Sequence, residues 1–246
     1  MAEKRVAVVL GSSGAVGQRL LSELVGNPAF GTVLTVVRTP SKSLGKDNKV
    51  VEHVVSDMKD LDKEVEKAVS SIGGASSSSS SSVVGFSTLG VGHGTIFLSI
   101  DQHRAVDVEL NRQFAQGLKN TGRVKHMVFM SAAGADPEAY AGGPGSAGMP
   151  RYNRVKGEAE EAVKAIGFDS LSIFRPAAIL GIPNTGKLVE WIVPLFGFMT
   201  PAKMQSVRVE DLAKSMALRG AQDLPGDKVK VFHHPEMMEL INHTSG

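Results

Sequence analysis

The feature that most constrains the fold is the order of three segments at the start of the chain. An apolar run over residues 5–10 leads directly into a turn that holds Gly11, Gly14 and Gly17. Residues 18–25 follow with leucines at helical spacing. A continuous apolar run is typical of a strand buried on both faces of a parallel sheet. A strand, a tight turn and a helix in this order begin a βαβ unit and indicate an α/β fold.

The rest of the chain continues this alternation. Further strands are predicted at residues 32–37, 50–55, 83–89, 124–130, 170–174 and 229–232. Helices are predicted at residues 60–71, 101–119, 152–166 and 209–219. The pattern predicts a doubly wound, mostly parallel Rossmann sheet with helices on both faces, in a single domain over residues 1–246. We expect the serine run at 76–82 to be a surface insertion, and residues 180–246 to form the substrate side.

Composition excludes several classes of protein. Lys and Arg total 27 against 25 Asp and Glu, which argues against a nucleic-acid-binding surface. The absence of cysteine excludes disulfides and thiolate catalysis. No signal peptide is recognised, and the apolar stretch 188–199 is too short to span a bilayer and contains Pro194. We expect a cytoplasmic monomer or homodimer, and no metal site because the histidines lack ligand spacing.

The glycines of the first turn have three separate physical uses. Gly11 lets the strand bend sharply, Gly14 lets the backbone approach a pyrophosphate, and Gly17 lets the helix pack closely on the strand. The helix start offers unpaired N–H groups to phosphates, so Ser13, Ala15 and Val16 join the expected site. A simple tight turn is the alternative, but its position after a strand and before a helix favours dinucleotide binding.

Charge at the end of the second strand selects between the two nicotinamide cofactors. Arg38 stands there with Lys42 close behind and no acid nearby. A guanidinium accepts a 2′-phosphate, so the sequence favours NADP(H) over NAD(H), unless Arg38 is only a solvated surface residue. Asp57 ends the third strand, where it could accept the adenine amine while Met58 packs on the ring. The alternative for Asp57 is the N-cap of the next helix.

A second group of residues suggests proton-transfer chemistry. Tyr152 and Lys156 are four residues apart, so a helix places them on one face. A nearby ammonium stabilises a phenolate and can also bind a cofactor ribose. Ser131 follows a strand, where it could hold a substrate oxygen near the Tyr152 hydroxyl. The alternative is a half-exposed tyrosine beside a solvated lysine.

Several motifs in one order carry a family resemblance. They are residues 11–17, Phe86–Gly90, Lys125–Asp136, Tyr152–Glu158 and Phe174–Pro176. Together they resemble the atypical short-chain dehydrogenase/reductase superfamily, and most of all its Tat-interacting-protein-like (CC3-like) branch. The resemblance implies an NADP-binding Rossmann fold with Ser131, Tyr152 and Lys156 at the catalytic positions.

The resemblance also implies further cofactor contacts. Residues Ser87–Gly90, which include Thr88, Leu89 and Gly90, would line the nicotinamide ribose, and residues from Pro176 to Ile179 would border the nicotinamide. Many reductases of the superfamily carry an Asn in the helix before the serine strand. Here that helix holds both Asp107 and Asn111, and the sequence does not decide which of them points to the site.

Two functions follow from these observations. One is an oxidoreductase that moves hydride between NADP(H) and a small carbonyl or alcohol substrate. The other is a non-enzymatic module that senses NADP(H) or binds a partner. His93 lies in a glycine loop beside the expected nicotinamide, and Trp191 with its apolar neighbours suggests an apolar substrate, a dimer contact or core packing.

Overall fold

The sheet of the computed structural model is parallel throughout. The structure describes residues 4–40, 47–72, 82–91, 98–140, 149–182, 201–223 and 226–243. Every neighbouring pair in the seven-stranded sheet runs in the same direction, in the order β3-β2-β1-β4-β5-β6-β9. The strands are β1 (Arg5–Leu10), β2 (Phe30–Val37), β3 (Val50–Val54), β4 (Val83–Ser87), β5 (Val124–Met130), β6 (Ser170–Phe174) and β9 (Val229–Phe232).

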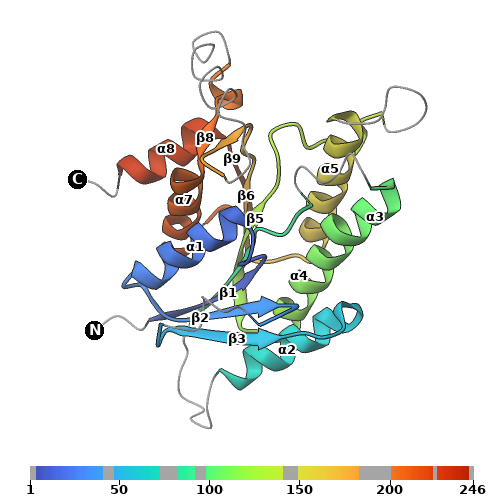
Figure 1. Cartoon of the computed structure of the whole chain (residues 1–246). Coiled ribbons are helices and arrows are strands. Elements are labelled where there is room, and N and C mark those ends of the chain that lie inside the picture. The colour runs from blue at the N-terminus through green and yellow to red at the C-terminus, as the bar shows by residue number, and fades with distance from the viewer. Residues whose placement is uncertain are drawn as a thin grey trace.

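Helices cover both faces of this sheet (Figure 1). On one face lie α1 (Ala15–Gly26), α7 (Val209–Ala221) and α8 (His234–Asn242). On the other lie α2 (Leu61–Ser71), α4 (Asn111–Asn120) and α5 (Met149–Ala165). The chain is therefore a single-domain Rossmann-like α/β protein, as its alternating pattern predicts. Across the described residues, no helix combines the length and apolar character needed to cross a bilayer.

Two hydrophobic cores explain why the strands are apolar on both sides. In β1, Ala7 and Val9 pack into the core beneath α1 and α7. Val8 and Leu10 point the other way, into the core beneath α2, α4 and α5. Because alternate side chains enter different cores, a continuous apolar run is what the central strand requires.

The helix expected at 101–119 is divided into three parts. It consists of α3 (Ile100–Arg104), a π-helical turn η4 (Ala105–Leu110) and α4. Ser99 begins it with a capping box to Gln102. The wider π-helical turn changes which side chains face the sheet, and such turns often occur at functional sites.

Several element boundaries differ from the predictions. β4 ends at Ser87, before Leu89, and α5 begins at Met149. Helix α8, which the sequence did not predict, follows β9 directly: His233 is its N-cap and shares a capping box with Glu236. The structure also has two unpredicted short strands, β7 (Ile179–Leu180) and β8 (Val207–Arg208), paired in parallel, and two 3₁₀ turns, η2 (Met58–Asp60) and η6 (Ala202–Met204).

The strand order reverses beside β1, at the carboxyl edge of the sheet. The chain runs outward from β1 to β2 and β3, and then returns to place β4 on the other side of β1. Ligands of such folds bind at this reversal, beyond the carboxyl ends of the strands. The glycine turn follows β1, Thr88 follows β4 and Ser131 follows β5, so all three lie along this edge.

Candidate functional site

The glycine turn is built by close backbone contacts that side chains would prevent. Gly11 has a φ of +85°, and a Cβ on it would lie 2.7 Å from the Leu89 nitrogen. A Cβ on Gly17 would lie 2.0 Å from the Gly11 carbonyl oxygen. Gly14 differs, since the nearest atom to its Cβ would be the Gly11 oxygen at 3.5 Å. Gly11 and Gly17 therefore serve the fold, whereas Gly14 keeps the outer side of the turn free of a side chain.

The first turn of α1 suits an anionic ligand. Gly14 is the N-cap and supplies no side-chain hydrogen bond, and the turn contains no acidic residue. Ala15, Val16 and Gly17 open the helix, so their amides lie at its positive end. By contrast, α2 and α7 each carry two acidic residues in the first turn. The backbone around Ser13–Gly17 therefore fits a dinucleotide pyrophosphate.

Arg38 and Asp57 lie beyond the ends of β2 and β3, and both are exposed. Arg38 makes no hydrogen bond or ion pair with another described residue, so its guanidinium is available to a phosphate. Asp57 is the N-cap of η2 and accepts a 3.0 Å hydrogen bond from the Lys59 amide. Of the two roles considered for Asp57, the structure shows the cap. Met58 packs against the core, and Lys42 lies outside the described residues.

The segment after β4 connects the glycine turn to α5. The Thr88 hydroxyl donates to the Gly11 carbonyl over 3.2 Å, and the Thr88 amide donates to the Leu10 carbonyl over 3.0 Å. Two residues later, a Cβ on Gly90 would lie 3.5 Å from Lys156 Nζ. The residues expected to hold the cofactor are thus continuous in space with the expected catalytic lysine. His93 lies outside the described residues.

Lys156 is buried with only 2% of its surface exposed, on the inner face of α5. Its Nζ lies 3.2 Å from Asp107 Oδ1 and 3.5 Å from the Met130 carbonyl oxygen. Burial alone lowers the pKa of Lys156, but the nearby Asp107, Tyr152 and Glu160 outweigh burial and raise that pKa above its ordinary value. The contact with Asp107 therefore favours the cationic form of Lys156.

Tyr152 lies one helical turn before Lys156 and is half-buried. Its ring stacks on the imidazole of His103, with ring centroids 5.9 Å apart and planes 20° apart. His103 is fully buried. The predicted pairing of Tyr152 with Lys156 on one helical face is thus present, with His103 fixing the orientation of the phenol.

Asp107 points into the site from the π-helical turn η4. Besides Lys156, it accepts a 3.0 Å hydrogen bond from the Val91 amide through Oδ2, and this oxygen lies 3.6 Å from His103 Nε2. Burial raises the pKa of Asp107, but Lys156, His103 and the Val91 amide outweigh burial and hold it below its ordinary value. Asn111 instead bonds Ser87 and the Asp107 carbonyl. Of the two residues that the sequence left open, Asp107 is the one that contacts Lys156.

Ser131 lies at the end of β5, but its hydroxyl is already in use. It donates a 2.6 Å hydrogen bond to Oε1 of Glu160, one helical turn after Lys156. Arg175, after β6, binds both oxygens of the same carboxylate at 2.8 and 2.6 Å. The orienting role predicted for Ser131 stays a prediction, and it would require the hydroxyl to leave Glu160.

The remaining predicted contacts lie after β6. Pro176 is buried, and its carbonyl accepts a 2.9 Å hydrogen bond from the Ala133 amide. Ile179 is half-buried in β7, which pairs with β8. Of the segment 180–246 expected on the substrate side, residues 183–200, including Trp191, lie outside the described residues.

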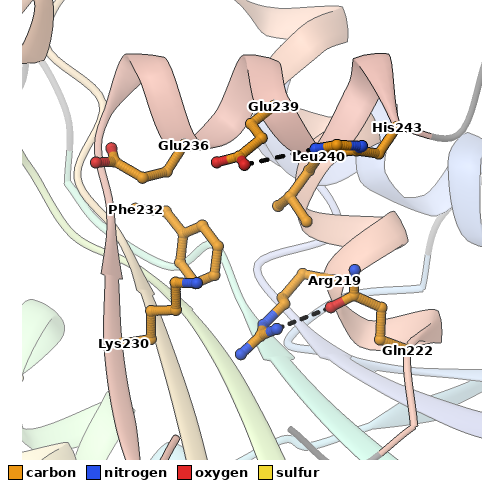
Figure 2. Close-up of a pocket in the computed structure, with 8 residues that line it drawn as sticks. All are labelled: Arg219, Gln222, Lys230, Phe232, Glu236, Glu239, Leu240 and His243. Atoms are coloured by element: carbon orange, nitrogen blue, oxygen red, sulfur yellow. Dashed lines mark hydrogen bonds and ion pairs between the residues drawn. The ribbon is translucent and has the colours of Figure 1, made fainter.

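A pocket of about 380 Å³ opens elsewhere, between α7, α8 and β9 (Figure 2). It contains none of the predicted site residues; its lining consists of Arg219, Gln222, Lys230, Phe232, Glu236, Glu239, Leu240 and His243. In its lining, Arg219 donates to the Gln222 side-chain oxygen over 2.8 Å, and Glu239 lies 3.5 Å from His243. We therefore place the functional site at the glycine turn rather than in this pocket.

The sequence of this chain matches a known protein family. The family described as NAD(P)H-binding matches residues 11–217. The chain belongs to this NAD(P)H-binding family. Within it, the chain is an atypical short-chain dehydrogenase/reductase of the HTATIP2-like branch. The match includes the glycine turn, β4, α5 and the first part of α7, and hence every part of the site described above.

Curated relatives of this NAD(P)H-binding protein include two groups. "Protein FMP52-1, mitochondrial" of Scheffersomyces stipitis is 31% identical over 182 residues, which cover 74% of this chain and 70% of that protein. "Protein HTATIP2" of Rattus norvegicus is 28% identical, covering 79% of this chain and 71% of that protein. Several relatives are named mitochondrial. The predicted cytoplasmic location is therefore wrong, since these names point to mitochondria.

Solved structures share the fold. The Bordetella bronchiseptica enzyme WbmG in complex with NAD superimposes with a TM-score of 0.65 at 12% identity, covering 100% of this chain and 80% of that one. A short-chain dehydrogenase/reductase from Serratia marcescens has a TM-score of 0.63 at 15% identity, covering 96% and 98%. These similarities support the Rossmann architecture of this NAD(P)H-binding protein.

Sequence reasoning did not identify three residues of the site: Glu160, Arg175 as its partner, and His103. One signal was available, because Tyr152, Lys156 and Glu160 are spaced by four and four residues and so share one face of α5. No comparable signal existed for His103, since its stacking on Tyr152 depends on how α3 packs against α5.

Proposed function

We propose that this protein is an NADP(H)-dependent oxidoreductase acting on a small carbonyl or alcohol substrate of apolar character. The observation that carries the proposal is the continuity of two features: the phosphate-binding turn after β1, and the buried Lys156 beside Tyr152. They meet at Gly90, where a Cβ would lie 3.5 Å from Lys156 Nζ.

The residues of the chain would divide the work as follows. The turn Ser13–Gly17 holds the pyrophosphate, and the exposed Arg38 binds the 2′-phosphate that distinguishes NADP from NAD. Thr88, Leu89 and Gly90 line the nicotinamide ribose. Pro176 and Ile179 would border the nicotinamide, and Asp57 and Met58 would lie beside the adenine.

When bound at this site, NADPH would supply the hydride that the carbonyl carbon accepts. The Tyr152 hydroxyl gives its proton to the carbonyl oxygen, and Lys156 stabilises the resulting phenolate. In the reverse direction the phenolate takes the alcohol proton. Ser131 has two candidate roles in this reaction: it orients the substrate oxygen directly, or it holds Glu160 and thereby α5.

Cofactor binding provides the first test. NADPH fluorescence titration of the wild type should show binding at least tenfold tighter than NADH. Arg38→Ala should remove this preference by weakening NADPH alone, because NADH has no 2′-phosphate to lose. Arg208→Ala is a matched control, since Arg208 is an exposed arginine on β8. Equal affinity of the wild type for the two cofactors would reject the NADP assignment.

A second candidate function is a non-enzymatic NADP(H) sensor or partner-binding module. The hydrogen bond from Ser131 to Glu160 favours it, because the hydroxyl expected at the substrate is otherwise engaged. Limited proteolysis within residues 132–150, with NADP, NADPH or no ligand, separates the two functions. Protection by cofactor without turnover of any carbonyl supports the sensor, and cleavage that ignores the cofactor rejects it.

A further inference from the structure

A buried carboxylate neutralises the lysine of the proposed site. Asp107 and Lys156 are 1% and 2% exposed, and they form a 3.2 Å ion pair. A fully buried ammonium without a counter-charge tends to lose its proton, because burial disfavours the charged form. Something must therefore keep Lys156 charged in this position.

We propose that Asp107 is a positioning residue that keeps Lys156 cationic and fixed beside Tyr152. This inference rests on the proposed function, in which the ammonium supports the phenol and the cofactor ribose. The contact is direct and comes from a different element, η4, so it ties the π-helical turn to α5. Asp107 touches neither substrate nor cofactor in this account and acts through Lys156.

Asp107 is the main negative charge that faces the Lys156 ammonium. Tyr152 and Glu160 face Lys156 from its own helix, but the Glu160 carboxylate is bound on both oxygens by Arg175. Phe129 and the Met130 carbonyl approach from β5. His103 of α3 faces Asp107. The other nearby acid, Glu158, is paired with Arg104 and Arg154 on the outer side of α5.

Asp107 also connects the lysine to the cofactor side. Its second oxygen accepts the hydrogen bond of the Val91 amide, directly after the segment expected to line the nicotinamide ribose. A Cβ on Gly90 would lie 3.1 Å from Asp107 Oδ1. The same carboxylate thus fixes the ammonium and the adjoining loop relative to one another.

The variant Asp107→Asn tests this role because it keeps the shape and removes the charge. In the wild type, the pKa of Lys156 lies above its ordinary value, so the ammonium remains intact across neutral pH. Without the carboxylate, burial dominates and we expect the pKa of Lys156 to fall by two units or more. Since the cation is the supporting form, activity of the variant should fall as pH rises through this lowered value.

Ionisation of Lys156 can be followed without any substrate. Protein labelled with ¹³C-lysine is titrated by NMR from pH 6 to 11, and Lys156→Met identifies the signal. We expect the Lys156 signal to move only at high pH in the wild type and at least two units earlier in Asp107→Asn. Asp101→Asn is the matched control: Asp101 is exposed on the adjoining α3, 3.9 Å from Arg104, and should change neither the signal nor the rate.

Each outcome decides the question. If Lys156 of Asp107→Asn titrates as in the wild type, Asp107 does not maintain its charge and the inference is wrong. If the variant does not fold, the wild-type titration decides instead, because loss of the Lys156 proton below pH 9 overturns the inference. Failure of the wild type to oxidise NADPH with any carbonyl rejects the proposed function only, since the NMR titration involves no turnover.

Discussion

The hydroxyl of Ser131 donates a 2.6 Å hydrogen bond to Oε1 of Glu160, and both residues are almost completely buried. Because Arg175 binds the same carboxylate, this hydrogen bond belongs to a network that joins the ends of β5 and β6 to α5. Tyr152 and Lys156 lie on that helix. The network therefore fixes the helix that carries the proposed catalytic pair.

Removing the Ser131 hydroxyl should affect stability more than turnover. We expect Ser131→Ala to lower the free energy of unfolding by about 2 kcal/mol, the contribution of a hydrogen bond to a buried charged group. The rate should fall less than tenfold. Urea unfolding and steady-state rates measure the two effects. Ser22→Ala, which removes an exposed hydroxyl bonded to the Gln18 carbonyl, is the control and should cost little. A loss of a hundredfold or more in rate would instead assign Ser131 to the substrate.

Gly14 should matter for cofactor binding and not for folding. Its Cβ would meet nothing closer than 3.5 Å, so Gly14→Ala should unfold at nearly the wild-type temperature. The added methyl group would project where the pyrophosphate approaches, and NADPH affinity should fall by a hundredfold or more. Gly26→Ala, which adds a methyl group to open space, should change neither property.

Gly17 provides the opposite case. A Cβ there would lie 2.0 Å from the Gly11 oxygen, and Gly17→Ala should therefore destabilise the fold itself. Thermal unfolding followed by circular dichroism compares the two variants. If Gly14→Ala bound NADPH as tightly as the wild type, the phosphates would not lie on this turn.

His126 should make stability depend on pH. Burial, with the positive charges of Arg219 and Arg5, lowers the pKa of His126 from 6.5 to about 4. The folded protein therefore holds His126 neutral in a range where the unfolded chain binds a proton. Stability is fully present above pH 6.5 and falls as the pH decreases toward 4, by about 2 to 3 kcal/mol between pH 7.5 and 4.5.

Urea unfolding at these two pH values measures the effect. In His126→Gln the stability difference between pH 7.5 and 4.5 should shrink by most of that amount. His243→Gln should leave this stability difference unchanged, because the His243 side chain is 79% exposed. If His126→Gln kept the full stability difference between the two pH values, groups other than His126 would cause it and the prediction would be wrong.

The sequence predicted the sheet well because its information is local. An apolar run such as Val6–Leu10 reads as a strand without reference to the rest of the chain, and Gly11 and Gly17 are required by contacts within one turn. The pairing of Tyr152 with Lys156 follows from helix geometry in the same way. The helix α8, by contrast, is absent from the predicted elements, although His233 and Glu236 form a capping box at its start.

The parts that the sequence did not reveal depend on contacts between distant segments. Nothing local distinguishes Asp107 from Asn111, and only the π-helical turn η4 decides that Asp107 meets Lys156. The engagement of Ser131 likewise depends on Glu160, 29 residues away, and on Arg175 from another strand. Such pairings arise from tertiary packing, which a pattern within one window of sequence does not contain.

The most direct test of the proposed function is single-turnover oxidation of NADPH with a panel of small carbonyl compounds, comparing the wild type, Tyr152→Phe and Tyr140→Phe. The chain has only two tyrosines, and Tyr140 is 69% exposed, so it provides a matched control. We predict oxidation of NADPH by the wild type and Tyr140→Phe, and a loss of a hundredfold or more in Tyr152→Phe. Equal rates in all three proteins would contradict the account.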